Sequence, residues 1–252
     1  MLLRFVIGIL FFTTLIFAKT INIACSANVS YAIPTLQKEF NKIYPNIKTR
    51  IILGSSGKLT AQISNGAPYD IFLSANMKYP NALYENKIAI SKPVIYAQGT
   101  LAIFSKNQRS FRDKIQLLKS MLVKRIAIAN PKTAPYGVAT FEALKNANIL
   151  DEIKDKIIYG ESISQTVAYT TMVADVGIVA KSSLYSSQLK KYHKNVHWIE
   201  LDKTLYSPIN QGMVILKNAN DIKNYKEVKA FYDFVLSKKG KNILKKFGYQ
   251  IP

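Results

Sequence analysis

Serine side chains follow two apolar segments of this chain, at points where a strand passes into a helix. Ser26 comes directly after the run TINIAC, and Ser55 and Ser56 follow IIL inside a Gly-Ser-Ser-Gly sequence. A helix N-terminus offers unpaired N–H groups and a partial positive charge, and serine hydroxyls add neutral donors. Together these groups suit a tetrahedral oxyanion without any Lys or Arg in the site. Serine is also a favoured helix cap, so the pattern alone supports an oxyanion site and ordinary capping equally.

Motifs of enzymes are scarce. The chain contains no G-x-S-x-G elbow, no G-x-x-x-x-G-K-[ST] loop and no G-x-G-x-x-G fingerprint, and the two adjacent serines have no obvious base. Its two histidines, His193 and His197, lie in a Lys-rich and aromatic stretch without the spacing of a metal site. Its single cysteine, Cys25, permits no intramolecular disulfide and is expected to be a small buried strand residue. The scarcity of these motifs makes catalysis less expected without excluding it, and no resident metal or cofactor is expected.

The elements that would position the serines alternate between strands and helices. In the first part of the chain, strands are expected at 20–24, 47–53 and 70–73. Between them, apolar spacing predicts one helix from Ile33 to Ile43 and a shorter one after Gly54–Gly57. This β-α-β-α-β order predicts a mainly parallel sheet with helices on its faces.

A second α/β series follows. Strands are expected at 93–104 with a bend at Gly99, and at 125–129, 156–159, 175–179, 196–201 and 212–216. Helices are expected after Pro135, after Glu161-Ser162 with Val167 and Met172 on one face, and over 225–247 with a break near Gly240. Two such units indicate two lobes with a ligand cleft between them, at the carboxyl ends of the strands.

The first 18 residues differ in character from the rest. After Arg4, the run from Phe5 to Ala18 is apolar and uncharged, and it is shorter than the roughly 20 residues of a membrane span. A basic start, a short apolar stretch and a small residue at its end predict a cleaved secretory signal peptide at 1–18. The mature chain would begin at Lys19 and act in the periplasm.

The charge of the chain is strongly positive. Its 35 Lys and Arg against 15 Asp and Glu give a net charge of +20. Such a field favours anionic partners. The lysines are dispersed apart from 238–246, and no aromatic platform accompanies them as a nucleic-acid channel would require. These features disfavour nucleic acid and leave a small anion or an acidic membrane surface as the expected partner.

Six segments carry a family resemblance: ACSANVSYAI (24–33), GSSGKLTAQISNGAPYDIFLSAN (54–76), PKTAPYGVATFEAL (131–144), GESISQTVAY (160–169), ADVGIVAKSSL (174–184) and FYDFVLSKKGKNILKKFGY (231–249). In the second segment a Ser-Ser helix start precedes a G-A-P-x-D-[IL]-F strand. By the order and spacing of these segments, the mature chain resembles the periplasmic molybdate-binding proteins of ABC-type uptake systems. These are type II periplasmic binding proteins. The resemblance implies a two-lobed α/β fold, with lobe 1 at 19–95 plus 211–252 and lobe 2 at 96–210.

The resemblance also implies a set of ligand-binding residues. Ser26 and Ser56 would each donate a hydroxyl and an N–H to the oxyanion, and Tyr136 and Ile163 would donate backbone N–H groups. The tyrosine that donates a hydroxyl in the family falls on Ala180, which removes one donor.

Three hydroxyls near the implied site are candidates to replace that donor: those of Tyr136, Ser162 and Ser164. Lys181 is less suitable, because burying its ammonium is costly unless the anion pairs with it directly.

The function implied by the resemblance is capture of molybdate, and of tungstate, by a monomer that passes it to the membrane permease of an ABC importer. Three alternatives stay open: a binder of another oxyanion such as sulfate, a ferric-iron binding protein, and a secreted enzyme with an oxyanion hole at Ser55-Ser56. Ferric iron is disfavoured because the chain has no adjacent tyrosine pair and its positive field opposes a cation.

Overall fold

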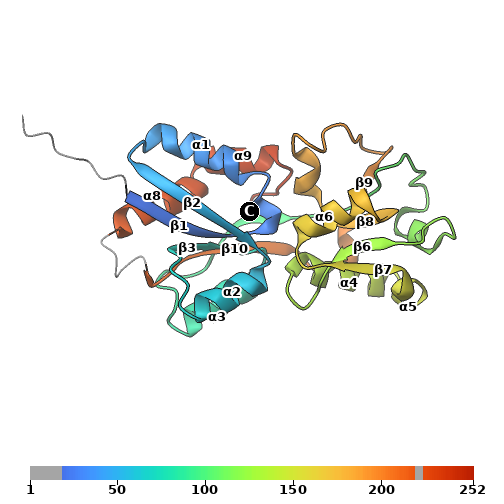
Figure 1. The fold of residues 1–252 in the computed structure, drawn as a ribbon, viewed down its shortest axis with the longest axis horizontal. Coiled ribbons are helices and arrows are strands. Elements are labelled where there is room, and N and C mark those ends of the chain that lie inside the picture. Colours follow the sequence, from blue (N-terminus) through green and yellow to red (C-terminus); the bar gives the residue numbers. More distant parts are fainter. Residues whose placement is uncertain (1–18, 219–223) are drawn as a thin grey trace, which may run out of the picture.

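The computed structural model describes residues 19–218 and 224–252, so the predicted signal peptide at 1–18 lies outside the described residues. The chain forms two α/β lobes side by side (Figure 1). Lobe 1 is built on a five-stranded sheet of order β2-β1-β3-β10-β4, and lobe 2 on a five-stranded sheet of order β7-β6-β8-β5-β9. The two-lobed α/β architecture predicted from the sequence is present.

Lobe 1 contains the two ends of the described chain. Its strands are β1 Lys19–Ser26, β2 Ile47–Gly54, β3 Ile71–Leu73, β4 Val94–Gly99 and β10 Ile209–Ile215. Its helices are the 3-10 turn η1 Ala27–Val29 and α1 Ile33–Ile43, α2 Ser56–Ser64, α3 Lys78–Glu85, α8 Tyr225–Leu236 and α9 Lys238–Lys246. Of these, α3 was not expected from the sequence.

Lobe 2 is formed by the middle of the chain. Its strands are β5 Leu101–Phe104, β6 Ile126–Ala129, β7 Ile157–Gly160, β8 Val176–Ala180 and β9 Trp198–Glu200. Its α-helices are α4 Pro135–Asn146, α5 Leu150–Ile153 and α6 Ile163–Met172. Four 3-10 segments complete it: η2 Lys114–Lys119, η3 Lys154–Lys156, η4 Lys181–Tyr185 and η5 Lys203–Leu205.

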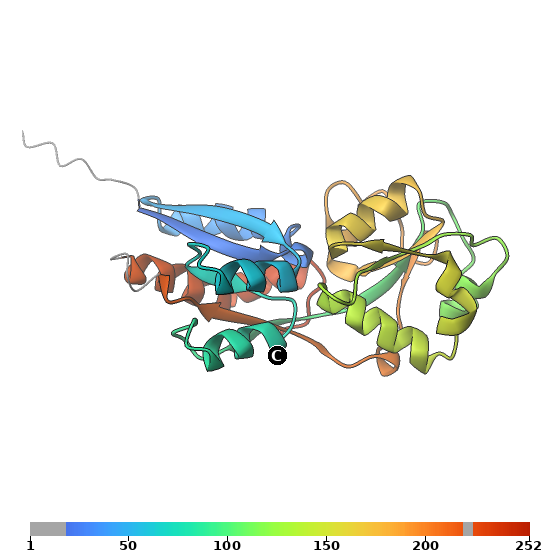
Figure 2. The same ribbon diagram turned by 60° about the horizontal axis from the view of Figure 1, so that its bottom comes forward.

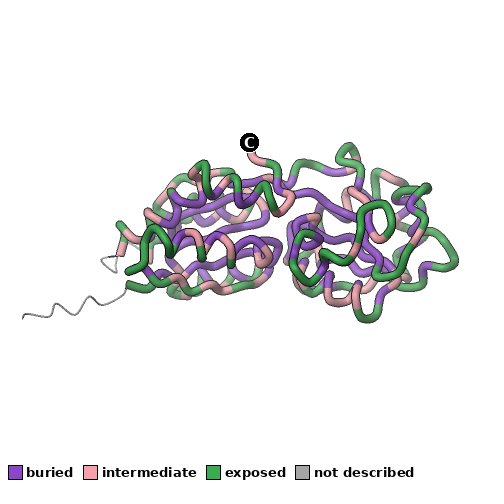
Figure 3. Tube along the Cα trace, turned by 90° about the horizontal axis from the view of Figure 1, so that it is seen from above, coloured by how far each residue is buried: buried purple, intermediate pink, exposed green. Residues whose placement is uncertain are grey.

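Each sheet lies between two layers of helices. In lobe 1, α1, α8 and α9 cover one face and α2 and α3 the other (Figure 1). In lobe 2, α4 packs on one face with Ile128 and Ile178, whereas Val167 of α6 packs on the other with Val179. Figure 3 shows buried residues in the interior of each lobe and exposed residues on the outside. Ligands of such sheets bind where the carboxyl ends of the strands meet, which here is the boundary between the lobes.

Both sheets are mixed rather than mainly parallel. In lobe 1, β1 pairs in parallel with β2 and β3, whereas β10 pairs antiparallel with β3 and β4. Lobe 2 is likewise divided into a parallel and an antiparallel half. In it, β6 is parallel to β7 and β8, and β5 is antiparallel to β8 and β9. The antiparallel halves contain the strands through which the chain passes from one lobe to the other (Figure 2).

The bend expected at Gly99 separates two strands. β4 ends at Gly99 in the sheet of lobe 1, and β5 begins at Leu101 in the sheet of lobe 2. The chain returns between β9 and β10. A single sequence run that looked like one bent strand therefore joins the two lobes.

Two details of the helices differ from the sequence prediction. The C-terminal helix breaks at Ser237 and not at Gly240, because the Ser237 hydroxyl accepts from the Gly240 N–H at 3.2 Å and begins α9. Met172 is 74% exposed while Val167 is buried. Residues five apart on a helix point roughly 140° away from each other, so these two cannot share a face.

Cys25 lies in β1 and is fully buried, as expected, and burial raises the pKa of its thiol. Among the described residues, no helix combines the length and apolar character needed to cross a membrane.

Candidate oxyanion site

The lobe 1 side of the site is formed where three neighbouring strands end. Ser26 is the last residue of β1 and lies opposite Gly54 of β2, and Ser56 begins α2 two residues later. The hydroxyls of Ser26 and Ser56 hydrogen-bond each other. The N–H of Ala75, just beyond β3, donates to both hydroxyls, at 3.1 Å to Ser26 and 3.0 Å to Ser56. The parallel pairing of β1 with β2 and β3 thus gathers groups that are far apart in the sequence.

The lobe 2 side of the site presents the first turns of two helices. Pro135 is the first residue of α4 and Tyr136 the second, while Ile163 is the first residue of α6. N–H groups at these positions have no acceptor inside their own helix. Within the described ranges, neither the Tyr136 N–H nor the Ile163 N–H donates to another protein group. Both remain available to an anion.

All four residues named from the sequence border one small cavity of about 10 Å³. Its lining residues are Ser26, Ala27, Asn28, Ser55, Ser56, Ala75, Ala134, Pro135, Tyr136 and Ile163, and none has a charged side chain. Neutral donors in a cavity of this kind bind an anion without fixing a counter-charge beside it. The space is small, so an anion would have to replace the hydrogen bond between the two serines with bonds to its own oxygens.

A buried polar network lies behind this cavity and joins the lobes. Gln211 of β10 donates from Nε2 to the Tyr136 hydroxyl at 3.0 Å. Its Oε1 accepts from the hydroxyl of Tyr96 at 2.8 Å and from the amide of Asn28 at 2.9 Å. Burial raises the pKa of both tyrosines well above its usual value, so both stay neutral. A Cβ at Gly99 would overlap the Tyr136 hydroxyl, which explains the need for glycine where the chain crosses between lobes.

Contacts on the rim hold the lobes together. The N–H of Gly57 donates to the carbonyl of Thr133 at 3.0 Å, and Lys58 pairs with Glu161 at 2.8 Å. The Ser164 hydroxyl donates to the carbonyl of Ala27 at 2.9 Å. Each of these bonds joins lobe 1 to lobe 2, so the described arrangement is the closed one.

Comparisons with known proteins agree with this fold. A family model described as bacterial extracellular solute-binding protein matches residues 21–250. The chain belongs to this family.

It is 34% identical over 199 residues to the molybdate-binding protein ModA of Rhodobacter capsulatus, covering 78% of this chain and 75% of that protein. It is 31% identical over 234 residues to ModA of Azotobacter vinelandii, covering 92% and 90%. The solved periplasmic molybdate-binding protein of Azotobacter vinelandii superposes with a TM-score of 0.84 at 28% identity, covering 92% of this chain and 99% of that one.

These relatives are named as binding proteins, which confirms the prediction that the chain is a solute-binding protein rather than an enzyme. Membership of an extracellular family also places its function outside the cytoplasm. The ligand-binding roles of Ser26, Ser56, Tyr136 and Ile163 remain predictions, although the structure brings these four residues together.

Of the three hydroxyls named as replacements for the family tyrosine, that of Ser164 donates its proton to a protein group, whereas those of Tyr136 and Ser162 act as acceptors. The Tyr136 hydroxyl accepts from Gln211, and the Ser162 hydroxyl accepts from the Gln165 N–H and so caps α6. The Ser164 hydroxyl donates to Ala27. Ala180 itself is fully buried.

Sequence reasoning missed two residues that organise the site. Ala75 holds both serine hydroxyls, and its position after the expected strand at 70–73 was the available signal. Gln211 lies just before the strand expected at 212–216, and no local pattern indicates that β10 begins earlier, at Ile209. Its partners come from three other elements, so only the fold identifies it.

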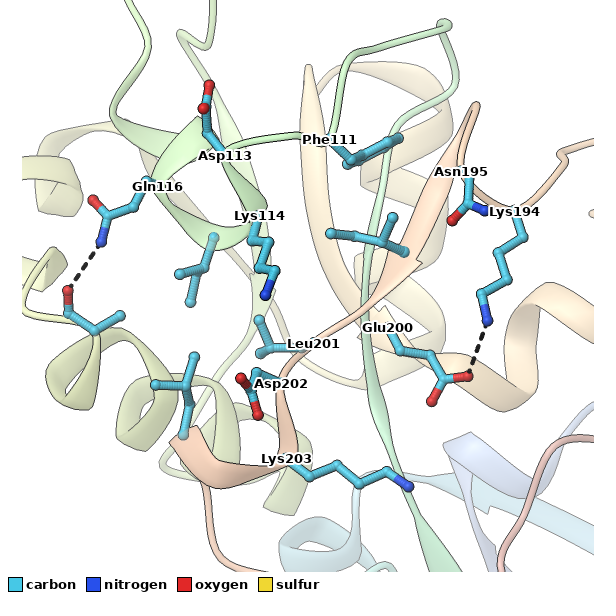
Figure 4. Close-up of a pocket in the computed structure, with 14 residues that line it drawn as sticks. Phe111, Asp113, Lys114, Gln116, Lys194, Asn195, Glu200, Leu201, Asp202 and Lys203 are labelled. Atoms are coloured by element: carbon cyan, nitrogen blue, oxygen red, sulfur yellow. Dashed lines mark hydrogen bonds and ion pairs between the residues drawn. The ribbon is translucent and has the colours of Figure 1, made fainter.

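A larger cavity, of about 670 Å³, lies in lobe 2 away from the four predicted residues (Figure 4). Three lysines and three carboxylates border it: Lys114, Lys194, Lys203, Asp113, Glu200 and Asp202. Because these charges balance, the cavity has no preference for an anion. His193 and His197 are not among its lining residues, and the described part of the chain contains no group of three or more His, Cys, Asp or Glu that could hold a metal ion.

Proposed function

We propose that this solute-binding protein captures molybdate, and also tungstate, and delivers it to the membrane permease of an ABC importer. The observation that carries the proposal is the convergence of two serine hydroxyls and two unpaired backbone N–H groups on one cavity without charged side chains. The relatives named as molybdate-binding proteins support molybdate as the ligand. Tungstate is included because it has the same charge and shape and nearly the same size.

The donor set favours a fully ionised anion. Molybdate accepts hydrogen bonds at all four oxygens and carries no proton at neutral pH. Hydrogen phosphate brings a proton that needs an acceptor, and no carboxylate borders the cavity to provide one. Molybdate is placed before sulfate because the relatives are named as molybdate-binding proteins.

Isothermal titration with molybdate, tungstate, sulfate and phosphate tests the proposal. We expect one tight site for molybdate and tungstate and at least a hundredfold weaker binding of the other two, which corresponds to about 2.7 kcal/mol. Tight binding of sulfate with weak binding of molybdate would instead assign the chain to sulfate.

Ferric iron and catalysis are less well supported. Iron needs ionised tyrosine or carboxylate ligands, whereas burial raises the pKa of Tyr136 and so disfavours its phenolate. For an enzyme, Ser56 would need a base, but its hydroxyl contacts only Ser26 and the N–H of Ala75 among the described residues. Titration would detect iron binding if the first alternative held and turnover if the second did.

The proposal includes the site of action and the division of the chain. Removal of residues 1–18 as a signal peptide would release a periplasmic monomer that begins at Lys19. The sequence-based division, 19–95 plus 211–252 for lobe 1 and 96–210 for lobe 2, is supported by the crossing points near Thr100 and between β9 and β10. Closure of the two lobes on the anion would then produce the form that the permease recognises.

A further inference from the structure

Ser55 occupies the N-cap position of α2 but does not cap the helix. Its backbone is extended, with φ −69° and ψ 149°, as an N-cap residue requires, yet its side chain makes no capping bond. The hydroxyl oxygen is buried and has no hydrogen-bond partner within the described residues. The whole residue is only 4% exposed. A buried hydroxyl without a partner destabilises the folded protein, so its presence needs an explanation.

The N-cap serines of two other α-helices behave differently. The Ser162 hydroxyl accepts from the N–H of Gln165 at the start of α6, and the Ser237 hydroxyl accepts from the N–H of Gly240 at the start of α9. Those two serines show the ordinary capping role. Among the serines at the N-caps of the described α-helices, Ser55 is therefore the exception, and its helix start is the one that borders the cavity.

Ser55 borders the cavity that contains Ser26, Ser56, Tyr136 and Ile163. The other hydroxyls on this cavity have partners, because Ser26 and Ser56 bond each other and Tyr136 accepts from Gln211. Among the hydroxyls that border this cavity, that of Ser55 has no hydrogen-bond partner within the described residues. An anion oxygen would supply the missing acceptor.

We propose that Ser55 is a third hydroxyl donor to the bound oxyanion, beside Ser26 and Ser56. This inference rests on the proposed function, since it needs an oxyanion in the cavity. It explains why Ser55 occupies the N-cap position of α2 without capping the helix. It also gives the site a hydroxyl in place of the one that Ala180 lacks.

The test is Ser55→Ala, measured by titration with molybdate and by thermal unfolding of the free protein. We expect the molybdate affinity to fall 10- to 100-fold, or about 1.4 to 2.7 kcal/mol. The unfolding midpoint of the free protein should stay the same or rise, because the lost hydroxyl satisfies no protein group. Ser55→Thr keeps a hydroxyl and should recover most of the affinity.

Ser237→Ala is the matched control, since it removes a serine that does cap a helix and lies outside the cavity. It should lower the unfolding midpoint and leave molybdate affinity unchanged. If Ser55→Ala behaves like this control, Ser55 is a simple cap and the inference is wrong, while the proposed function stands. If the wild-type protein binds neither molybdate nor tungstate, the proposed function is wrong and the inference is wrong with it.

Discussion

The hydroxyls of Ser26 and Ser56 hydrogen-bond each other although the residues are 30 positions apart. Parallel pairing of β1 with β2 places Ser26 beside the end of β2, where α2 begins. Both hydroxyls accept from the N–H of Ala75, so each uses one lone pair for the protein. An anion between them would receive their protons without disturbing the bonds from Ala75. The pair therefore has to give up only its mutual hydrogen bond to donate to an oxyanion.

Removing either of these hydroxyls should weaken binding. We expect Ser26→Ala and Ser56→Ala each to lower molybdate affinity by about 1.5–3 kcal/mol, because a hydrogen bond to a charged group is lost. Stability should change little in each single variant, since the other serine still accepts from Ala75. Titration calorimetry and thermal unfolding measure the two effects. Unchanged affinity in both variants would refute the assigned roles.

The bond between Gln211 and the Tyr136 hydroxyl should slow release of the ligand. Tyr136→Phe leaves the backbone N–H in place and removes only a buried bond between the lobes, worth about 0.5–1.5 kcal/mol. We expect molybdate to dissociate up to about tenfold faster, with little change in its association rate. Stopped-flow fluorescence would record both rates. Tyr84→Phe, at an exposed position of α3, is the control; an equal effect there, or a change in association alone, would argue against this role.

The pair of Lys58 and Glu161 joins the lobes at the surface, with side chains 55% and 56% exposed. Exposed ion pairs contribute little free energy, and salt screens the attraction between their charges. We expect Glu161→Gln to lower affinity only a few-fold at low ionic strength and not at all at high ionic strength. Asp233→Asn, which breaks an exposed pair inside α8, should have no effect at either. A double-mutant cycle with Lys58→Ala that gives no coupling would show that the pair does not stabilise closure.

Affinity should be nearly constant between pH 5 and 8. Within the described part of the chain, no histidine, carboxylate or lysine borders the cavity. Burial raises the pKa of Tyr136, so its phenol stays protonated and continues to accept from Gln211 through this range. Titrations at several pH values and constant ionic strength provide the measurement. A sharp loss of affinity near pH 6.5 would indicate a histidine close to the ligand.

A tyrosine at position 180 should not fit. Ala180 is fully buried in the core of lobe 2, pairs with Leu101 of β5 and does not border the cavity. Overpacking of this kind costs about 1–3 kcal/mol or more. We expect Ala180→Tyr to lower the unfolding midpoint, whereas Val138→Tyr at an exposed position should not. Higher affinity at unchanged stability would reveal space beside the ligand and contradict this prediction.

Local patterns in the sequence were sufficient to find most elements of the fold. Spacing of Ile33, Leu36 and Phe40 predicts α1, and all three residues are buried. The alternation of strands and helices predicts two α/β lobes, and the Ser-Ser turn marks the start of α2. These features follow from side-chain periodicity and turn chemistry, which act over a few residues.

Prediction was poorest where distant segments determine the outcome. The sheets are mixed because β10 and β5 return between strands that the sequence order cannot place beside them. The helix break was expected near Gly240 but lies three residues earlier, at Ser237, which begins α9. The strand order depends on contacts between distant segments, whereas the helix break depends on the local bond between Ser237 and Gly240.

The sequence by itself determined the donor types and the loops that present them: serines after two strands and helix starts at Tyr136 and Ile163. Only the tertiary structure decided which hydroxyls are free to bind. It makes the Tyr136 hydroxyl an acceptor for Gln211 and leaves the Ser55 hydroxyl without any partner among the described residues. The physical reason is that a hydrogen bond depends on distance and direction between groups. For residues as far apart in the chain as Tyr136 and Gln211, packing of the two lobes sets both.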